Sequence, residues 1–228
     1  MTETSKKSQG TIAGVRALVF DLDGTLIDSK LDLALSIDAT LKHMGRASLP
    51  HELIYSFVGN GAAVLVRRAL GDSVTDAEAE EGHKFFLAYY RDHMLDNTVT
   101  YPGVREALEA LGHHPMAVLT NKPVRFSEKI LEGLGIASYF RYVYGGNSFE
   151  TKKPDPEGMN TILRAFDLQP REAMLVGDSD VDVRTARNAG TWACGVSYGL
   201  GLESMRAHPP DIMLDNMAEL PAYLNGKS

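Results

Sequence analysis

The sequence predicts a doubly wound α/β fold, a parallel sheet with helices on both faces, interrupted near its start by an all-helical insertion. Short apolar runs, typical of buried parallel strands, alternate along most of the chain with segments of helical periodicity. Proline and glycine residues punctuate this alternation, as expected at the ends of helices. Between residues 30 and 97 the alternation stops, and only helical patterns are found.

Six apolar runs are expected to form the sheet, because each is short and most are followed by a helical segment. They are RALVF (16–20), MAVLT (116–120), YVYGG (142–146), AMLVG (173–177), WACGV (192–196) and the weaker DIML (211–214). The helices are expected at residues 103–111, 124–134, 157–166, 181–189 and 216–224. Since open α/β sheets bind ligands beyond the carboxyl ends of their strands, functional residues should follow these runs.

The inserted segment is expected to form a helical domain of its own. LDLALSIDATLKHMG (31–45) spaces its apolar residues at near-helical intervals, and segments 61–71 and 78–95 are also helical in pattern. We therefore predict a core made of residues 1–29 and 98–228, and a helical cap made of residues 30–97. The expected hinges between the two are residues 29–30 and 97–100.

The composition indicates a globular protein that handles small molecules. Its 23 Lys and Arg residues against 30 Asp and Glu residues give a net charge of −7, which argues against nucleic-acid binding. No apolar run approaches the roughly 18 residues that cross a bilayer, so no membrane partner is expected. The first ten residues are polar, lack the apolar centre of a secretory signal, and are expected to form a frayed tail. The single Cys194 cannot form an internal disulfide, which favours a cytoplasmic location.

Polar and charged side chains gather where four of the predicted strands end. Each has an ordinary explanation when taken alone: an Asp-x-Asp pair in a loop is commonly solvated, and Asp178 with Ser179 could cap a helix. Chance would seldom arrange all of them at successive strand ends. The residues are Asp21 and Asp23 after the first strand, Thr120 and Asn121 after the second, Lys153 after the third, and Asp178 with Asp182 after the fourth.

These motifs, in this order, resemble those of the haloacid dehalogenase (HAD) superfamily of phosphotransferases. DLDGT (21–25) and GDSDVD (177–182) are its most specific parts, and the Thr120 strand end and the Lys153 loop add to it. The resemblance implies a Rossmann-like core with a helical cap inserted after the first motif. It also implies a phosphatase that depends on Mg²⁺.

The resemblance assigns a chemical role to each motif residue. Asp21 would be the nucleophile that forms an aspartyl phosphate, and Asp23 would protonate the leaving oxygen and later activate water. Lys153 would place a positive charge on the nucleophile and the phosphate. Thr120 and Asn121 would hold phosphoryl oxygens, as electrostatic preorganisation requires.

The charges of this site call for a metal ion. Two like charges about 4 Å apart cost about 4 kcal/mol at an effective dielectric constant of 20, and several carboxylates would meet a phosphate dianion here. Mg²⁺ relieves this repulsion because it prefers oxygen ligands and bridges carboxylates to phosphate. By resemblance, its ligands are the carboxylates of Asp21 and Asp178 and the backbone carbonyl of Asp23. Asp182 would lie nearby and act through water or through these ligands.

Further segments resemble the phosphoglycolate phosphatases of this superfamily. They include FVGNGAAVLVRRAL (57–70) in the cap, YPGV (101–104), LTNKP (119–123), KKPDPE (152–157) and SYGLG (197–201). The resemblance implies hydrolysis of 2-phosphoglycolate to glycolate and phosphate. It makes Gly59, Asn60 and Gly61 a loop of the cap that faces the substrate. Arg67 becomes a candidate partner of the substrate carboxylate, since arginine suits bidentate carboxylate binding.

Other functions stay open on the sequence alone. Pyrophosphate, a nucleotide or a sugar phosphate could replace 2-phosphoglycolate as the small anionic phosphorylated partner. A β-phosphoglucomutase-like phosphotransferase would use the same core. A silent binding module would require a lost catalytic residue, and none of the expected ones is missing. The sequence does not indicate an oligomeric state.

Overall fold

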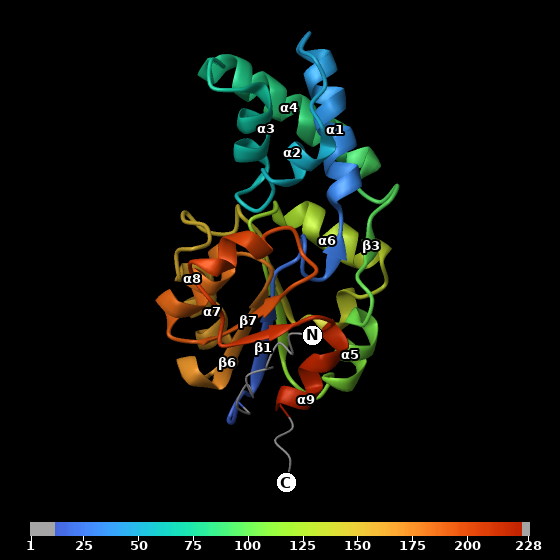
Figure 1. The fold of residues 1–228 in the computed structure, drawn as a ribbon. Coiled ribbons are helices and arrows are strands. Elements are labelled where there is room, and N and C mark those ends of the chain that lie inside the picture. The colour runs from blue at the N-terminus through green and yellow to red at the C-terminus, as the bar shows by residue number, and fades with distance from the viewer. Residues whose placement is uncertain (1–11, 225–228) are drawn as a thin grey trace, which may run out of the picture.

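The computed structural model describes residues 12–224 and confirms the predicted α/β class. Six parallel strands form one sheet in the order β5-β4-β1-β6-β7-β8 (Figure 1). All six predicted runs form strands, including the weakest one, with ends that differ by at most two residues. The predicted tail of residues 1–10 lies outside the described residues. The strands are β1 (Ala17–Phe20), β4 (Met116–Leu119), β5 (Tyr142–Tyr144), β6 (Ala173–Gly177), β7 (Trp192–Val196) and β8 (Ile212–Leu214).

Two layers of helices cover the two faces of the sheet (Figure 1). Alternate residues of a strand point to opposite faces, and β1 shows this directly. Leu18 and Phe20 pack with α5 (Val104–Ala110), α6 (Val124–Gly133) and α9 (Leu220–Leu224). Ala17 and Val19 pack with α7 (Glu157–Phe166) and α8 (Asp180–Ala189). Because both faces are covered, the central strands are buried throughout, and only their ends are available for chemistry.

The predicted helix at residues 216–224 is wrong as a single element. The chain forms a short 3-10 turn, η4 (Met217–Glu219), before α9 begins. The Asn216 side chain accepts a hydrogen bond from the backbone N–H of Ala218, which caps this turn. Pro221 lies in the first turn of α9, where its missing N–H has no helical partner to lose. Three further 3-10 turns are η1 (Ala137–Tyr139), η2 (Pro170–Glu172) and η3 (Leu202–Arg206).

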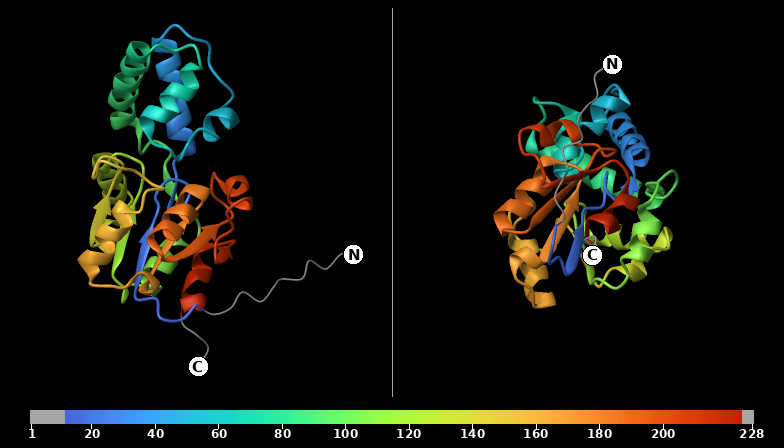
Figure 2. Two further views of the ribbon diagram at one scale, coloured as in Figure 1. Left: turned by 90° about the vertical axis from the view of Figure 1, so that its left-hand side faces the viewer. Right: turned by 60° about the horizontal axis from the view of Figure 1, so that its bottom comes forward.

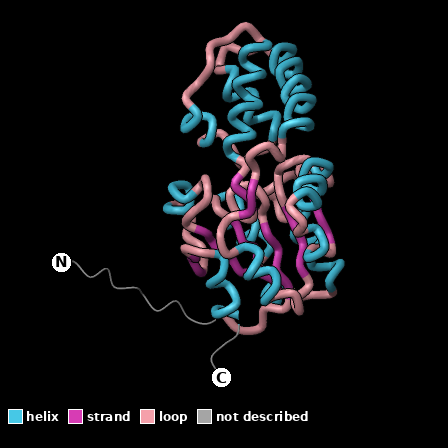
Figure 3. The backbone as a smooth tube through the Cα atoms, turned by 90° about the vertical axis from the view of Figure 1, so that its right-hand side faces the viewer, coloured by secondary structure: helices cyan, strands magenta, loops and turns pink. Residues whose placement is uncertain are grey.

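The inserted segment is all helical, as predicted, and stands over one end of the sheet (Figure 2, Figure 3). Its helices are α1 (Lys30–His43), α2 (His51–Tyr55), α3 (Ala62–Leu70) and α4 (Asp76–His93). The sequence predicted three of them; α2 was missed because five residues are too few to show a helical period. No helix within residues 12–224 has the length and apolar character needed to cross a bilayer.

Two short strands, also missed from the sequence, join the core to the helical segment. β2 (Ile27–Asp28) leads out and β3 (Val99–Thr100) leads back, and they pair antiparallel. The buried carboxylate of Asp32 fastens the two connections together. It accepts hydrogen bonds from the backbone and side-chain amides of Asn97 and from the backbone N–H and hydroxyl of Thr98, at 2.7–3.0 Å. The expected hinge residues therefore lie where the two connections run side by side, and the Asp32 carboxylate holds these connections together.

Candidate active site

The loop after β1 turns sharply and places its two carboxylates in different surroundings. The backbone N–H of Asp21 still continues the sheet by bonding to the carbonyl of Val176 at 2.9 Å. Gly24 then adopts a φ of 83°, and its N–H bonds to the carbonyl of Ile27 at 2.9 Å. A Cβ at Gly24 would collide with the carboxylate of Asp178, so glycine is required for contact as well as for conformation. This turn brings the loop after β1 against the loop after β6.

Three carboxylates meet in this buried region. One oxygen from each of Asp21, Asp178 and Asp182 lies within 4.8 Å of the other two. Burial raises the pKa of Asp21 to about 6. Burial, together with the charges of Asp182 and Asp21, raises the pKa of Asp178 to about 8, although the backbone N–H groups of Leu200 and Gly201 donate to its Oδ2. The described residues alone therefore leave the cluster with too little positive charge.

Lys153 is the cation that reaches the cluster. Its ammonium lies 2.6 Å from Oδ1 of Asp182 and 2.8 Å from Oδ1 of Asp21, and its side chain is 3% exposed. Burial alone would lower the pKa of Lys153, but the charges of Asp182 and Asp21 raise it above its usual value. Although the second contact is an ion pair, Oδ1 of Asp21 accepts no well-aligned hydrogen bond. Asp182 is thus a member of the cluster itself and a direct partner of Lys153.

Thr120 and Asn121 follow β4 and lie beside this cluster. Both are buried, and the backbone N–H of Thr120 bonds to the carbonyl of Tyr144, so the strand holds them in place. The side-chain oxygen of Asn121 accepts from the N–H of Lys153 at 3.1 Å. Its side-chain nitrogen donates to the carbonyls of Lys153 and Gly59, both at 3.1 Å. Asn121 therefore positions the Lys153 loop and contacts the helical segment at the same time.

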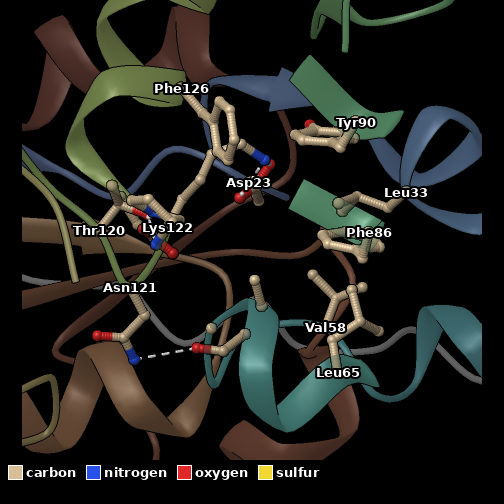
Figure 4. Close-up of a pocket in the computed structure, with 15 residues that line it drawn as sticks. Asp23, Leu33, Val58, Leu65, Phe86, Tyr90, Thr120, Asn121, Lys122 and Phe126 are labelled. Atoms are coloured by element: carbon tan, nitrogen blue, oxygen red, sulfur yellow. Dashed lines mark hydrogen bonds and ion pairs between the residues drawn. The ribbon is translucent and has the colours of Figure 1, made fainter. Parts of the chain in front are cut away.

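Asp23 has a partner that the sequence did not reveal. The ammonium of Lys122 lies 2.8 Å and 3.1 Å from its two carboxylate oxygens (Figure 4). The hydroxyl of Ser29 donates to one of these oxygens. The same ammonium lies over the ring of Tyr90, 4.6 Å from its centre. Lys122 stands in the quoted stretch LTNKP, but a lysine in a loop is ordinarily exposed, and no local signal indicates its burial.

A cavity of about 40 Å³ lies between the core and the helical segment. Asp21, Asp23 and Lys122 supply its charged wall, and the opposite wall is mostly apolar (Figure 4). The full lining is Asp21, Asp23, Leu33, Val58, Gly59, Gly61, Ala62, Leu65, Phe86, Tyr90, Thr120, Asn121, Lys122, Pro123 and Phe126. The predicted loop therefore contributes Gly59 and Gly61 to the lining, while Asn60 does not belong to it.

The structure does not bring Arg67 to this cavity. Its guanidinium pairs with the exposed Asp76 at 2.7 Å and lines a separate, open hollow on α3 and α4. All the other predicted motif residues meet at the carboxyl edge of the sheet, as parallel strand ends must. Arg67 was predicted to bind substrate because of its residue type alone. Whether its side chain faces the cavity depends on how α3 packs, which the sequence does not indicate.

The fold and the site together define a Rossmann-like α/β protein with a helical cap, in which the helical insertion covers a cluster of carboxylates at the edge of a parallel sheet. Within that class, the chain belongs to the haloacid dehalogenase-like hydrolase family, whose model matches residues 18–196. The predicted superfamily is thereby confirmed. Asp21, Asp23, Thr120, Lys153 and Asp178 all fall inside the matched range.

Individual relatives agree with this assignment. The chain is 40% identical over 214 residues to a phosphoglycolate phosphatase from Pseudomonas putida, covering 90% of this chain and 78% of that protein. It is 38% identical over 216 residues to a phosphoglycolate phosphatase from Vibrio parahaemolyticus, covering 90% and 94%. A solved structure of a predicted phosphoglycolate phosphatase from Haemophilus somnus 129pt superposes with a TM-score of 0.85 at 34% identity, covering 90% and 96%. These similarities indicate that the chain is an enzyme, a hydrolase of the phosphatase type.

Proposed function

We propose that this protein is a Mg²⁺-dependent phosphomonoester hydrolase that acts through a phosphorylated Asp21, with 2-phosphoglycolate as its substrate. The observation that carries the proposal is the division between the two carboxylates of one loop. Both carboxylates line the cavity, but Asp21 joins the buried cluster with Lys153, whereas Asp23 pairs with Lys122. Two carboxylates held two residues apart in such different surroundings suit two different roles.

The reaction needs both carboxylates in turn. An oxygen of Asp21 forms a bond to phosphorus while the bond from phosphorus to the leaving oxygen breaks, and Asp23 gives its proton to that oxygen. Asp23 then takes a proton from the water that attacks the phosphorus of the aspartyl phosphate, which releases inorganic phosphate and restores Asp21. Lys153 and the hydroxyl of Thr120 stabilise negative charge on the phosphoryl oxygens.

The cluster of Asp21, Asp178 and Asp182 fits a magnesium ion. Its donors are carboxylate oxygens, which this ion prefers, and one of them, Oδ1 of Asp21, is buried with the Lys153 ammonium as its ion-pair partner but accepts no well-aligned hydrogen bond. Asp21, Asp178 and the backbone carbonyl of Asp23 would hold the ion, and Asp182 would stay with Lys153. When bound, the ion offsets the negative charge shared by the carboxylates and the phosphate.

The substrate part of the proposal is supported by the relatives and by the cavity. Both curated relatives are phosphoglycolate phosphatases and match nine-tenths of this chain, including the helical segment. A cavity of about 40 Å³ has room for a leaving group of only a few atoms, since a single water needs about 10–15 Å³ by this measure. A cavity of this size suits a short leaving group such as glycolate better than a nucleotide or a sugar. Residues 30–97 act as the cap that closes over the substrate.

A steady-state comparison of substrates tests the proposal. We expect 2-phosphoglycolate to have the highest kcat/KM among it, pyrophosphate, a nucleotide and a sugar phosphate, and we expect excess chelator to abolish release of phosphate. A value tenfold higher for another compound, about 1.4 kcal/mol, would remove the phosphoglycolate assignment and keep the phosphatase. Free phosphate must also be the product, because a mutase would return an isomer.

The covalent role of Asp21 has its own test. Asp21→Asn keeps the size of the side chain but removes the nucleophile, so we expect turnover to fall at least about 1,000-fold while the circular dichroism spectrum stays native. Thr161→Ser, a conservative change on α7 outside the cavity lining, is the control and should keep wild-type activity. Retention of most activity by Asp21→Asn would exclude the aspartyl phosphate.

A further inference from the structure

Lys122 is a buried cation that the proposed chemistry does not use. It is 6% exposed, it lines the cavity, and its ammonium donates to both oxygens of Asp23. Burial alone would lower the pKa of Lys122, but the neighbouring Asp23 and Tyr90 raise it above its usual value. The side chain is therefore charged at neutral pH. Among the described residues that line the cavity, Lys122 is the one cation.

Tyr90 contributes a second donor to the same place, from the other side. It stands on α4 of the helical segment, is 1% exposed, and lines the cavity with its ring centre 4.6 Å from the ammonium of Lys122 (Figure 4). Its buried hydroxyl finds no hydrogen-bond acceptor within residues 12–224, because the neighbouring ammonium of Lys122 can only donate to it. Burial raises the pKa of Tyr90 to about 12, so the phenol keeps its proton. A buried donor without an acceptor destabilises the site, and an acceptor brought by a ligand would remove that penalty.

The hydrogen bonds of Asp23 show what must change when substrate binds. One of its oxygens accepts from Lys122 and from Ser29, and the other accepts from Lys122. A carboxyl that gives its proton to a leaving group needs one oxygen free of such donors. The ammonium of Lys122 must then find another acceptor inside a cavity whose opposite wall is apolar.

We propose that Lys122 and the hydroxyl of Tyr90 form the specificity site for a carboxylate on the leaving group. Without substrate, Lys122 rests on Asp23; a substrate carboxylate takes the ammonium and the phenol as its two donors and releases Asp23 from the ion pair. This inference rests on the proposed function and deepens it. It selects phosphomonoesters of short hydroxy acids over neutral esters of the same length, and it gives to Lys122 the role that Arg67 was expected to play.

Two substrates that differ only in this group provide the test. 2-Phosphoglycolate carries the carboxylate, and 2-hydroxyethyl phosphate replaces it with a neutral hydroxymethyl group of similar size. For the intact protein with Mg²⁺ we expect kcat/KM to favour 2-phosphoglycolate by at least about 100-fold, because a site built to bind a charged group rejects the analogue that lacks it. In Lys122→Met this ratio should fall at least about 30-fold, and in Tyr90→Phe about tenfold.

A matched control separates specific binding from general attraction of anions. Lys152 is an exposed lysine of the neighbouring loop that does not line this cavity, and Lys152→Met removes the same charge. We expect that variant to change the ratio by less than about threefold, because exposed charges are screened. An equal change in Lys152→Met would overturn the inference, since any nearby cation would then serve.

The other possible results of these assays also test the proposed carboxylate site. If Lys122 only positions Asp23, then Lys122→Met lowers kcat/KM for both substrates equally and leaves the ratio unchanged, which overturns the inference. If Lys122→Met does not fold, Tyr90→Phe, which loses a single hydroxyl, decides in its place. A wild-type protein that hydrolyses both esters equally well keeps the phosphatase and overturns the carboxylate site. A wild-type protein that releases phosphate from neither overturns both proposals.

Discussion

In the absence of metal, the free energy of unfolding of the protein should decrease as the pH rises. Burial, with Asp182 and Asp21 adding to it, raises the pKa of Asp178 from 3.8 to about 8, and burial raises that of Asp21 to about 6. A carboxyl whose pKa is higher in the folded protein binds its proton more tightly there. Its contribution to stability is therefore complete below pH 3.8 and is lost as the pH rises through the folded pKa values, about 6 and about 8.

The size of the effect follows from these values. Within this window, each pH unit lowers the free energy of unfolding by about 1.4 kcal/mol for one such group. Between about pH 5 and about pH 8, Asp178 alone then costs about 4 kcal/mol. A protein of this size changes its Tm by about 2–4 °C per kcal/mol, so the Tm in chelator should fall by about 10 °C over that range. Mg²⁺ should restore most of the loss near pH 8, because it binds the same ionised carboxylates.

Scanning calorimetry in EDTA measures this slope, and Asp178→Asn is the matched control. The amide has the same size but does not titrate, so the slope should become much flatter in the variant. Burial lowers the pKa of His83 and His114, so these histidines increase the free energy of unfolding as the pH rises. This effect opposes that of Asp178 and is the same in the wild-type protein and in Asp178→Asn. A wild-type Tm that stays level or rises between about pH 5 and about pH 8 in EDTA would refute the proposed charge imbalance.

Three further outcomes follow from the packing around the site. Gly24→Ala should weaken Mg²⁺ binding at least about tenfold by isothermal titration, because the new methyl displaces the carboxylate of Asp178. Gly14→Ala has the same φ of 83° but nothing within 4 Å, so it should leave the affinity unchanged; equal losses would disprove the contact. Asp32→Asn replaces a carboxylate that accepts charge-assisted hydrogen bonds with an amide that is in part a donor. It should lower the free energy of unfolding, measured with denaturant, by about 2–4 kcal/mol. A decrease below about 1 kcal/mol would contradict the role of Asp32 in holding the two connections together. Arg67→Met should keep kcat/KM for 2-phosphoglycolate within about threefold, since its partner is an exposed carboxylate outside the cavity; a loss of about 100-fold would return it to the site.

The sequence predicted the sheet well because each strand is short, apolar and buried on both faces. RALVF and AMLVG read as strands without knowledge of their neighbours, and the structure pairs them at the centre of the sheet. The polar residues that follow such runs then share one edge, so Asp21, Thr120 and Asp178 could be expected to meet. What the sequence missed lacks such a period: β2 and β3 have two residues each, and α2 has five.

The sequence by itself determined the reactive edge of the sheet, since parallel strands bring their carboxyl ends together whatever the loops do. Only the tertiary structure decided which charges face one another there. In the sequence, Lys122 is an ordinary loop lysine. In the folded protein, α4 packs over it, Tyr90 shields it from water, and Asp23 is its ion-pair partner. Arg67, which is equally plausible by residue type, lies on the outward side of α3 and pairs at the surface. Burial and pairing depend on contacts between segments far apart in the chain, and no local pattern records them.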